Sequence, residues 1–432
     1  MRVLERIRRS DVLHHGAIVF GGVLVFNVCN FLFYMLVGRL ASVEVYGEVT
    51  ALAASMLLLA APALVAQLIV ARVAAELEAR GDRAALRRLA DAVTRWPLLA
   101  GVLVVLVAAL ARDPIARFLN LTDSGAIVTT AVATALLFTA YVQRGVLQGA
   151  HLFGDLSGSM ALEATSRALL TVVLVVPFAA TGALGATALA LLLTVLYHGW
   201  RFATRFGARR APLALDTRTL VRVTAGVGVG QLTLTVLTFY DVPIIKHAFD
   251  AHAAGLYAAA ALVGRAVIAA SAFIPTIVLP KATARVAAGR SPLGLFFAAV
   301  GLTLAAVALA TLAGMFFPRV IVTAISGRAF GDAAPLVLTY VLASGALALA
   351  TVIASYNFGL HRYTFVVPAT LAAAAEVVTL ALWHPTLQAA VGVLALGHTC
   401  VLVCMLYRIT TPAPVVTSPV QGTEGFGAAE FG

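Results

Sequence analysis

The feature that most constrains this chain is a series of apolar stretches, each long enough to cross a bilayer as a helix. A hydrocarbon core of about 30 Å needs about 20 helical residues. Charged residues make up 11% of the 432 residues and hydrophobic residues 61%, whereas soluble domains carry roughly 25% charged residues. Because so few charges cannot cover a soluble surface, the sequence predicts an all-α polytopic membrane protein.

Twelve stretches have this length, and only short junctions separate some of them. Thr181 and Gly182 separate the fifth from the sixth, and His384 and Pro385 separate the last two. An even number of spans places both termini on the same side. The predicted spans cover residues 15–37, 47–70, 97–117, 125–147, 157–178, 183–200, 221–245, 253–279, 292–317, 333–357, 363–383 and 387–407.

The positions of the basic residues indicate the orientation. Lys and Arg number 30 against 19 Asp and Glu, for a net charge of +11. In the twelve-span arrangement, 22 of the basic residues lie on the side of the N-terminus and six on the other side. Since cytoplasmic loops carry the excess of Lys and Arg, we expect both termini in the cytoplasm. This bias explains the basic charge without a nucleic-acid partner.

Three segments outside the spans also carry predictions. Residues 71–95 are charged and Ala-rich, with Leu86, Leu89 and Val93 on one helical face, so they predict an amphipathic helix along the cytoplasmic surface. Residues 201–220 are expected to link two halves of the chain. The tail at 411–432 is rich in Pro, Gly, Thr and Ser and is predicted to be disordered.

Short matches at nearly one offset indicate an internal repeat. The sequence ARVAA occurs at residues 71–75 and again at 284–288. Each half would hold six spans and start on the same side, which predicts two parallel six-helix bundles, at 1–212 and 213–410, around a central cavity. This is the architecture of an alternating-access transporter. The other matches pair Gly47 with Gly255 and residues 149–153 with 359–363.

Ionisable residues inside spans are candidate functional groups, because burying a charge in lipid is costly. Arg265 lies near the middle of the eighth span and has no acid on its own helix. Its expected partner is a residue on another helix, an anionic ligand or water. Asp241 and Lys246 lie in the outer part of the seventh span. They are candidates for the cavity, with contact between the bundles as the alternative.

Glu163 and Arg167 are four residues apart on the fifth span, which predicts an ion pair with either a structural or a transport role. Glu376, in the eleventh span, is a candidate for titration or for an interhelical hydrogen bond. Arg144 lies near the inner end of the fourth span, where its side chain can reach the interface.

Neutral polar residues form a stripe on the first span. Asn27, Asn30 and Tyr34 recur at helical spacing, so they are predicted either to face a cavity or to bond a neighbouring helix. His247 and His252 flank a short outside loop and are expected to be solvated.

Enzyme and nucleotide chemistry lack their usual sequence signals. Neither of the two lysines, Lys246 and Lys281, is followed by Ser or Thr, which excludes a Walker A loop. No His or Cys set has zinc spacing, so we expect neither a metal nor a cofactor. The outside loops are short, whereas a membrane-embedded glycosyl- or acyltransferase would need a carboxylate or His constellation on a long loop.

Four segments carry a resemblance to a known family. They are NFLFYMLVGRLASVEVYGEVTAL at 30–52, ARVAAELEARGD at 71–82, RGVLQGAHLFGDLS at 144–157 and DVPIIKHAFDAHAAGLYAAAALVGRAV at 241–267. In these segments the chain resembles polysaccharide biosynthesis flippases of the multidrug/oligosaccharidyl-lipid/polysaccharide exporter superfamily. The resemblance covers nearly all of residues 10–410.

The resemblance implies a MATE-like fold that moves undecaprenyl-diphosphate-linked sugars between the leaflets of a bacterial inner membrane. The implied partners are a lipid-linked glycan, membrane lipids and a proton or sodium ion for coupling. A cationic cavity for the diphosphate belongs to that picture, and Asp241, Lys246 and Arg265 lie in a matched segment. The lipid II flippases of the superfamily usually have 14 spans, so twelve spans argue against that branch. A rival is a cation-coupled multidrug antiporter of the same fold, whose cavity would hold acids without matching arginines.

Overall fold

The computed structural model describes the backbone of residues 2–209, 211, 217–287 and 290–406, and these residues form helices and no strand. The predicted tail at 411–432 and the predicted boundary at 212 and 213 lie outside them. The elements are α1 (Arg2–Leu40), α2 (Val43–Ala79), α3 (Arg83–Leu110), α4 (Arg112–Phe118), α5 (Gly125–Gly149), α6 (Phe153–Phe206), α7 (Thr217–Phe239), α8 (Asp241–Ala248), α9 (Ala251–Ser271), α10 (Phe273–Ala287), α11 (Leu293–Phe316), α12 (Pro318–Ser326), the 3₁₀ helix η1 (Arg328–Ala333), α13 (Ala334–Gly359), α14 (Val366–Leu382) and α15 (Leu387–Leu406).

Ten helical segments in the described part of the chain are long and apolar enough to cross a membrane. The predicted all-α membrane class is therefore confirmed. One of the ten segments is α6, with 54 residues, and the 17-residue α14 is a shorter apolar helix beyond the ten. The count of twelve would need both α14 and two crossings by α6. It stays a prediction, because α14 is shorter than the usual span of about 20 residues.

The long α6 is a hairpin of two helical arms. Ala179 has φ 45° and ψ −126°, which breaks the helix three residues before the predicted junction at Gly182. Gly182 then packs so closely on Leu174 that a Cβ would overlap the Leu174 carbonyl oxygen. Asp155 near the start of α6 forms an ion pair of 2.6 Å with Arg201 near its end. The two arms are therefore antiparallel.

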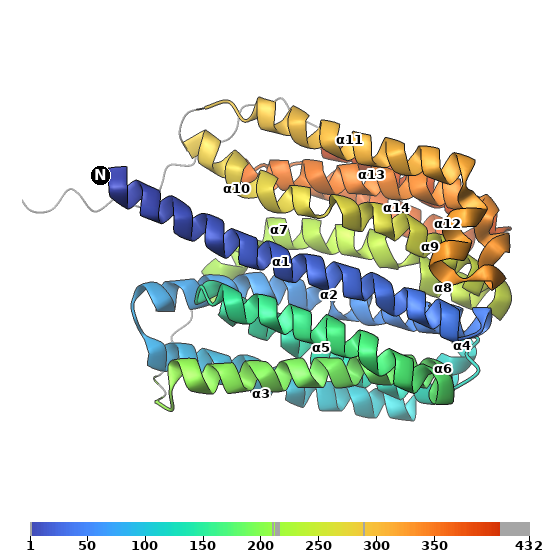
Figure 1. Ribbon diagram of the computed structural model, residues 1–432, viewed down its shortest axis with the longest axis horizontal. Helices are drawn as coiled ribbons and strands as arrows, with labels where there is room; N and C mark the ends of the chain where they lie inside the picture. Colours follow the sequence, from blue (N-terminus) through green and yellow to red (C-terminus); the bar gives the residue numbers. More distant parts are fainter. Residues whose placement is uncertain (1, 210, 212–216, 288–289, 407–432) are drawn as a thin grey trace, which may run out of the picture.

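The molecule consists of two similar halves, which we call the N-half (α1–α6) and the C-half (α7–α15). In the N-half, α5 packs against α2, α3 and α6. In the C-half, α13 takes the place of α5. It packs against α9 and α10 in the place of α2, against α11 in the place of α3 and against α15 in the place of α6. In Figure 1, the blue-to-green helices lie below and the yellow-to-orange helices above, with α1 and α7 running between them. The arrangement is the one that the internal repeat predicts.

The halves meet where corresponding residues face each other. A Cβ on Gly47 of α2 would lie only 2.9 Å from the backbone nitrogen of Gly255 on α9, so the two helices cross at these glycines. Glu44 and His252, separated by the same number of residues as the two glycines, form a contact of 3.0 Å. A residue meets its own counterpart only beside a twofold axis, so these contacts locate the axis that relates the halves.

The predicted amphipathic helix at 71–95 is wrong. Residues 71–79 continue α2, a turn with φ +68° at Gly81 follows, and α3 begins at Arg83. Asp82 caps α3 by accepting a hydrogen bond of 2.9 Å from the amide of Ala85. Leu86 and Leu89 are buried, as the apolar face requires, but they pack against other helices of the N-half. Because α3 is part of the helix bundle, this face packs against protein, whereas a helix lying on the membrane surface would turn it toward lipid.

The glycine crossing predicts a severe effect of Gly255→Val. The new Cβ would lie 2.1 Å from the carbonyl oxygen of Val43, so the helices must move apart. Overpacking of this kind destabilises by about 1–3 kcal/mol. We expect a lower melting temperature and lower folded yield in detergent, measured by fluorescence-detected size exclusion. The matched control is Gly301→Val, because a Cβ at Gly301 meets nothing within 4 Å; equal losses in both variants would contradict the crossing.

Candidate substrate cavity

A cavity of about 200 Å³ lies between the two halves and is bordered by α1, α2, α7 and α9. Asn27, Asn30 and Tyr34 line it from α1, so the polar stripe of the first span faces a cavity. Arg265 lines it from α9 and is the charged residue among the described lining residues. The cavity therefore combines amide and hydroxyl groups on one half with one guanidinium on the other.

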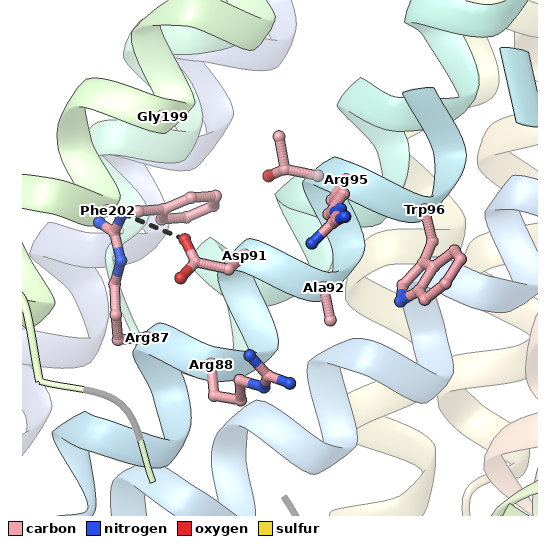
Figure 2. Close-up of a pocket in the computed structure, with 9 residues that line it drawn as sticks. Arg87, Arg88, Asp91, Ala92, Arg95, Trp96, Gly199 and Phe202 are labelled. Atoms are coloured by element: carbon pink, nitrogen blue, oxygen red, sulfur yellow. Dashed lines mark ion pairs between the residues drawn. The ribbon is translucent and has the colours of Figure 1, made fainter. Parts of the chain in front are cut away.

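A second, larger cavity of about 470 Å³ lies on the N-half alone, between α3 and the second arm of α6 (Figure 2). None of the predicted site residues lines it. Its position away from the boundary between the halves separates it from the central cavity.

Arg265 forms an ion pair with Asp241 on α8, with 3.0 Å between the guanidinium nitrogen and the carboxylate oxygen. The guanidinium also lies over the ring of Phe239, 5.1 Å from its centroid. Its Nε has no hydrogen-bond partner within the described residues. The side chain keeps 15% of its area exposed, whereas Asp241 keeps 1%. Arg265 thus lines the cavity with a partly exposed side chain while Asp241 balances its charge.

Asp241 is held by three side chains. Besides the pair with Arg265, it accepts a hydrogen bond of 3.0 Å from the hydroxyl of Tyr257 and another from the hydroxyl of Tyr340. It is also the first residue of α8, after a break in the helix at Tyr240, where the partial positive charge of a helix start favours a carboxylate. The carboxylate therefore keeps hydrogen-bond donors even when Arg265 turns away.

Glu376 on α14 lies behind this group, inside the C-half. It accepts a hydrogen bond of 2.7 Å from the hydroxyl of Tyr240, the neighbour of Asp241, and lies 3.2 Å from His398 Nε2. Its second oxygen, Oε2, has no partner in the part of the chain described. The polar groups Arg265, Asp241, Tyr240, Glu376 and His398 therefore form one series from the cavity into the C-half.

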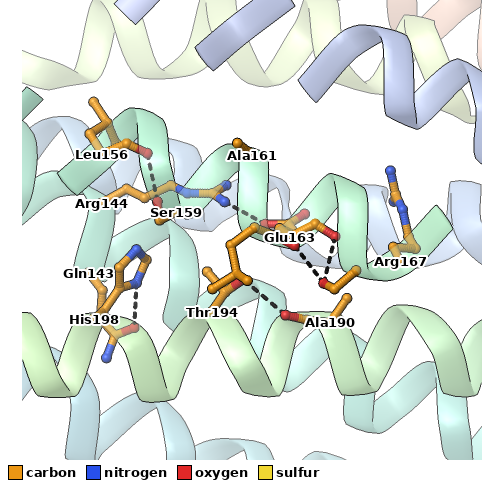
Figure 3. Close-up of polar contacts among 12 residues, drawn as sticks. Gln143, Arg144, Leu156, Ser159, Ala161, Glu163, Arg167, Ala190, Thr194 and His198 are labelled. Carbon is orange, nitrogen blue, oxygen red and sulfur yellow. Dashed lines mark hydrogen bonds and ion pairs between the residues drawn. The ribbon is translucent and has the colours of Figure 1, made fainter. Parts of the chain in front are cut away.

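The predicted ion pair between Glu163 and Arg167 is wrong. Glu163 pairs instead with Arg144 of α5, and both side chains are 4% exposed (Figure 3). The spacing of four residues permits a pair on one helix. However, Arg144 reaches Glu163 from the facing helix and satisfies it within the core of the N-half.

Arg167 points away from Glu163 in Figure 3 and bonds the side-chain oxygen of Asn30 on α1. Its guanidinium lies 4.8 Å from the ring centroid of Phe33. Since Asn30 lines the central cavity, Arg167 lies directly behind the cavity wall. Arg144 and Glu163 are not among the described residues that line the cavity.

Lys246 lies outside the central cavity. Its side chain is fully buried, and its ammonium has no hydrogen-bond partner among the residues described. The negative charges that act on it are those of Glu48, Asp250 and Glu44. Glu48 belongs to the N-half, so Lys246 is held near the boundary between the halves at the end where α1 finishes.

The halves are joined at this end of the molecule. Arg39 donates a hydrogen bond of 2.7 Å to the carbonyl of Ala324, and Asn120 donates one of 3.0 Å to the carbonyl of His247. His247 and His252 are exposed, as expected, but both also bond across the boundary. These contacts hold the two halves together at this end.

The sequence analysis did not identify three tyrosines that bond the buried acids. The hydroxyls of Tyr240, Tyr257 and Tyr340 donate hydrogen bonds to Asp241 and Glu376 in the C-half. A tyrosine within an apolar span is an amphipathic residue with one hydroxyl to satisfy. That signal is present in the sequence, but it does not reveal which acid the hydroxyl meets.

Membrane-length helices, two similar halves and a charged cavity between them define a membrane transporter. Residues 12–281 match the family described as polysaccharide biosynthesis protein. The chain belongs to this family, as its resemblance indicated, and the match supports a flippase or exporter rather than an enzyme. A comparison with curated proteins gives no match.

Solved structures of the superfamily share the fold. An inward-facing multidrug resistance MATE family transporter of the MOP superfamily aligns with a TM-score of 0.69 at 14% identity, over 90% of this chain and 96% of that chain. An outward-facing multidrug resistance MATE family transporter aligns at 0.60 and 16% identity, over 90% and 92%. A MOP superfamily transporter from Pyrococcus furiosus aligns at 0.54 and 15% identity, over 92% and 94%. The predicted MATE-like fold is confirmed.

The pairing seen in the N-half predicts the outcome of a double-mutant experiment. Glu163→Gln should lower the folded yield, because Arg144 is left as an unpaired buried charge at a cost of about 3–5 kcal/mol. Adding Arg144→Met should restore the yield in detergent extracts. Adding Arg167→Met instead should not, because Arg167 bonds Asn30. Rescue by Arg167→Met alone would contradict the assigned pair.

Proposed function

We propose that this protein is a flippase that moves an undecaprenyl-diphosphate-linked oligosaccharide or polysaccharide precursor across a bacterial inner membrane by alternating access. The family match supports the substrate class. The observation that carries the proposal is the placement of Arg265, a permanent cation, in the cavity between the halves.

A diphosphate suits this cavity in charge and geometry. The planar guanidinium forms paired hydrogen bonds with phosphate oxygens, which a lysine cannot. Asp241 balances Arg265 when no cargo is present, and its tyrosine bonds keep it satisfied when Arg265 turns to the cargo. The empty carrier then avoids an unpaired buried charge and still attracts an anion.

The size of the cavity limits what it holds in this conformation. Its volume of about 200 Å³ is below the roughly 300–1,000 Å³ of sites that enclose a drug-sized ligand. A headgroup fragment fits, and a whole oligosaccharide requires the halves to move apart. The lipid tail would stay in the bilayer beside the cavity during the movement.

Glu376 is the candidate for ion coupling in this proposal. Its carboxyl is 4% exposed, bonds a neutral tyrosine, and is linked through Tyr240 and Asp241 to the cavity residue Arg265. A proton or sodium ion taken up at Glu376 would change the charge balance behind the cavity. The MATE-type fold is equally compatible with a cation-coupled multidrug antiporter, but the Arg265 cation in the cavity favours an anionic cargo.

Arg265→Ala should abolish glycan export at near-normal abundance in the membrane. Asp241 would still accept the hydroxyls of Tyr257 and Tyr340, so the loss of Arg265 leaves it hydrogen-bonded. Arg265→Lys should restore only part of the activity, because a point charge does not form the paired hydrogen bonds. Export is measured by surface glycan in a strain that lacks its own flippase.

The control for this experiment is Arg112→Ala, at an exposed arginine outside the cavity, which should export normally. The decisive variant combines Asp241→Asn with Arg265→Gln and so removes the ion pair without leaving a lone charge. Normal export by this double variant would show that the pair only packs helices, and the anion site would then be abandoned.

The proposed orientation places both termini and the turn between α2 and α3 in the cytoplasm. In a background without Cys29, Cys400 and Cys404, a membrane-impermeant maleimide should label Arg112→Cys in intact cells and miss Arg80→Cys. Both positions are exposed on the molecule. Labelling of Arg80→Cys before permeabilisation would reverse the orientation.

A further inference from the structure

The larger cavity on the N-half is cationic and lies at the start of α3. Arg87, Arg88 and Arg95 line it together with Trp96 and the single acid Asp91. Asp91 forms an ion pair of 3.0 Å with Arg87. Neither Arg88 nor Arg95 has an acidic partner among the described residues, so the cavity carries an excess of positive charge.

One face of α3 supplies both cations. Arg88 and Arg95 are seven residues apart, two turns of helix, and therefore lie on the same side. Figure 2 shows their guanidinium groups on either side of Ala92, with the Trp96 indole beyond them. The second arm of α6 forms the opposite wall through Gly199 and Phe202.

The same face of α3 becomes apolar directly after the cavity. Leu99, Leu103, Leu106 and Leu110 continue the helical spacing and are 50–88% exposed. Eleven residues of helix rise about 16 Å, so these leucines give acyl chains a long apolar surface that begins next to the cavity. Trp96 is 68% exposed between the cationic and the apolar part, at the level where tryptophan marks a membrane interface.

We propose that this cavity binds the phosphate headgroup of an anionic phospholipid from the leaflet on the side of the α2–α3 turn. The guanidinium groups of Arg88 and Arg95 bond the phosphate oxygens, and the acyl chains lie along the exposed apolar face of α3. Basic pockets between membrane helices recognise anionic headgroups in this way. The site is separate from the central cavity, so the inference does not depend on the proposed cargo or on which leaflet is cytoplasmic.

The test measures lipid binding to the purified full-length protein in detergent, by native mass spectrometry and by thermal stabilisation. The probes are phosphatidylglycerol, phosphatidylcholine, inorganic phosphate and a polyprenyl diphosphate. We expect phosphatidylglycerol to bind and stabilise the protein more than phosphatidylcholine and inorganic phosphate do, and the polyprenyl diphosphate to bind independently of Arg88 and Arg95. Arg88→Glu combined with Arg95→Glu should weaken the binding of phosphatidylglycerol about tenfold or more. Each basic residue near a membrane surface strengthens the binding of an anionic lipid about fivefold.

The matched control is Arg80→Glu combined with Arg83→Glu, two exposed arginines at the α2–α3 turn that do not line the cavity. This variant has the same net charge and should bind phosphatidylglycerol as the wild type does. Equal weakening in both variants, or equal binding of phosphatidylcholine, would overturn the proposal. Equal binding of inorganic phosphate would indicate a free-anion site. A loss of polyprenyl diphosphate binding in the Arg88→Glu, Arg95→Glu variant as large as its loss of phosphatidylglycerol binding would indicate a second cargo site; either result also overturns the proposal.

Discussion

The cost of an unpaired charge inside a membrane protein governs the arrangement of the whole molecule. Arg265 is a permanent cation, and Asp241 lies 3.0 Å from it with the smaller exposure of the two side chains. The acid is in turn fixed by Tyr257 and Tyr340 from α9 and α13. One cation at the cavity wall is therefore balanced by polar residues that come from the three helices α8, α9 and α13.

The two halves avoid an unpaired buried charge in different ways. Glu163 and Glu376 have the same offset as the two ARVAA segments and lie on corresponding helices, the first arm of α6 and α14. Glu163 meets Arg144, which neutralises it within the N-half. Glu376 meets Tyr240 and His398, neither of which is a permanent cation. Glu163 is thus paired with a permanent cation, whereas Glu376 is held by a tyrosine and a histidine.

Hydrophobic length, positive charge in loops and a repeated segment can be recognised in the sequence without knowing which helices touch. They therefore predicted most of the architecture. The membrane class and the two-bundle architecture followed from them, and the family resemblance implied the MATE-like fold. Partner choice did not follow, because it depends on which helices face each other. The spacing of Glu163 and Arg167 suggested a pair on one helix, but α1 and α5 supply the actual partners. For Arg265 the absence of an acid on its own helix correctly indicated a partner elsewhere.

The closed end of the molecule is held by contacts that are individually weak. An exposed pair such as Glu44 and His252 contributes about 0–1 kcal/mol, and a hydrogen bond such as that from Arg39 to Ala324 contributes about 1 kcal/mol. Separating the halves here would break these contacts but would also hydrate the unpartnered ammonium of Lys246. The two effects oppose each other. A bound cargo shifts the balance between a closed and an opened arrangement only by the difference in its affinity for the two.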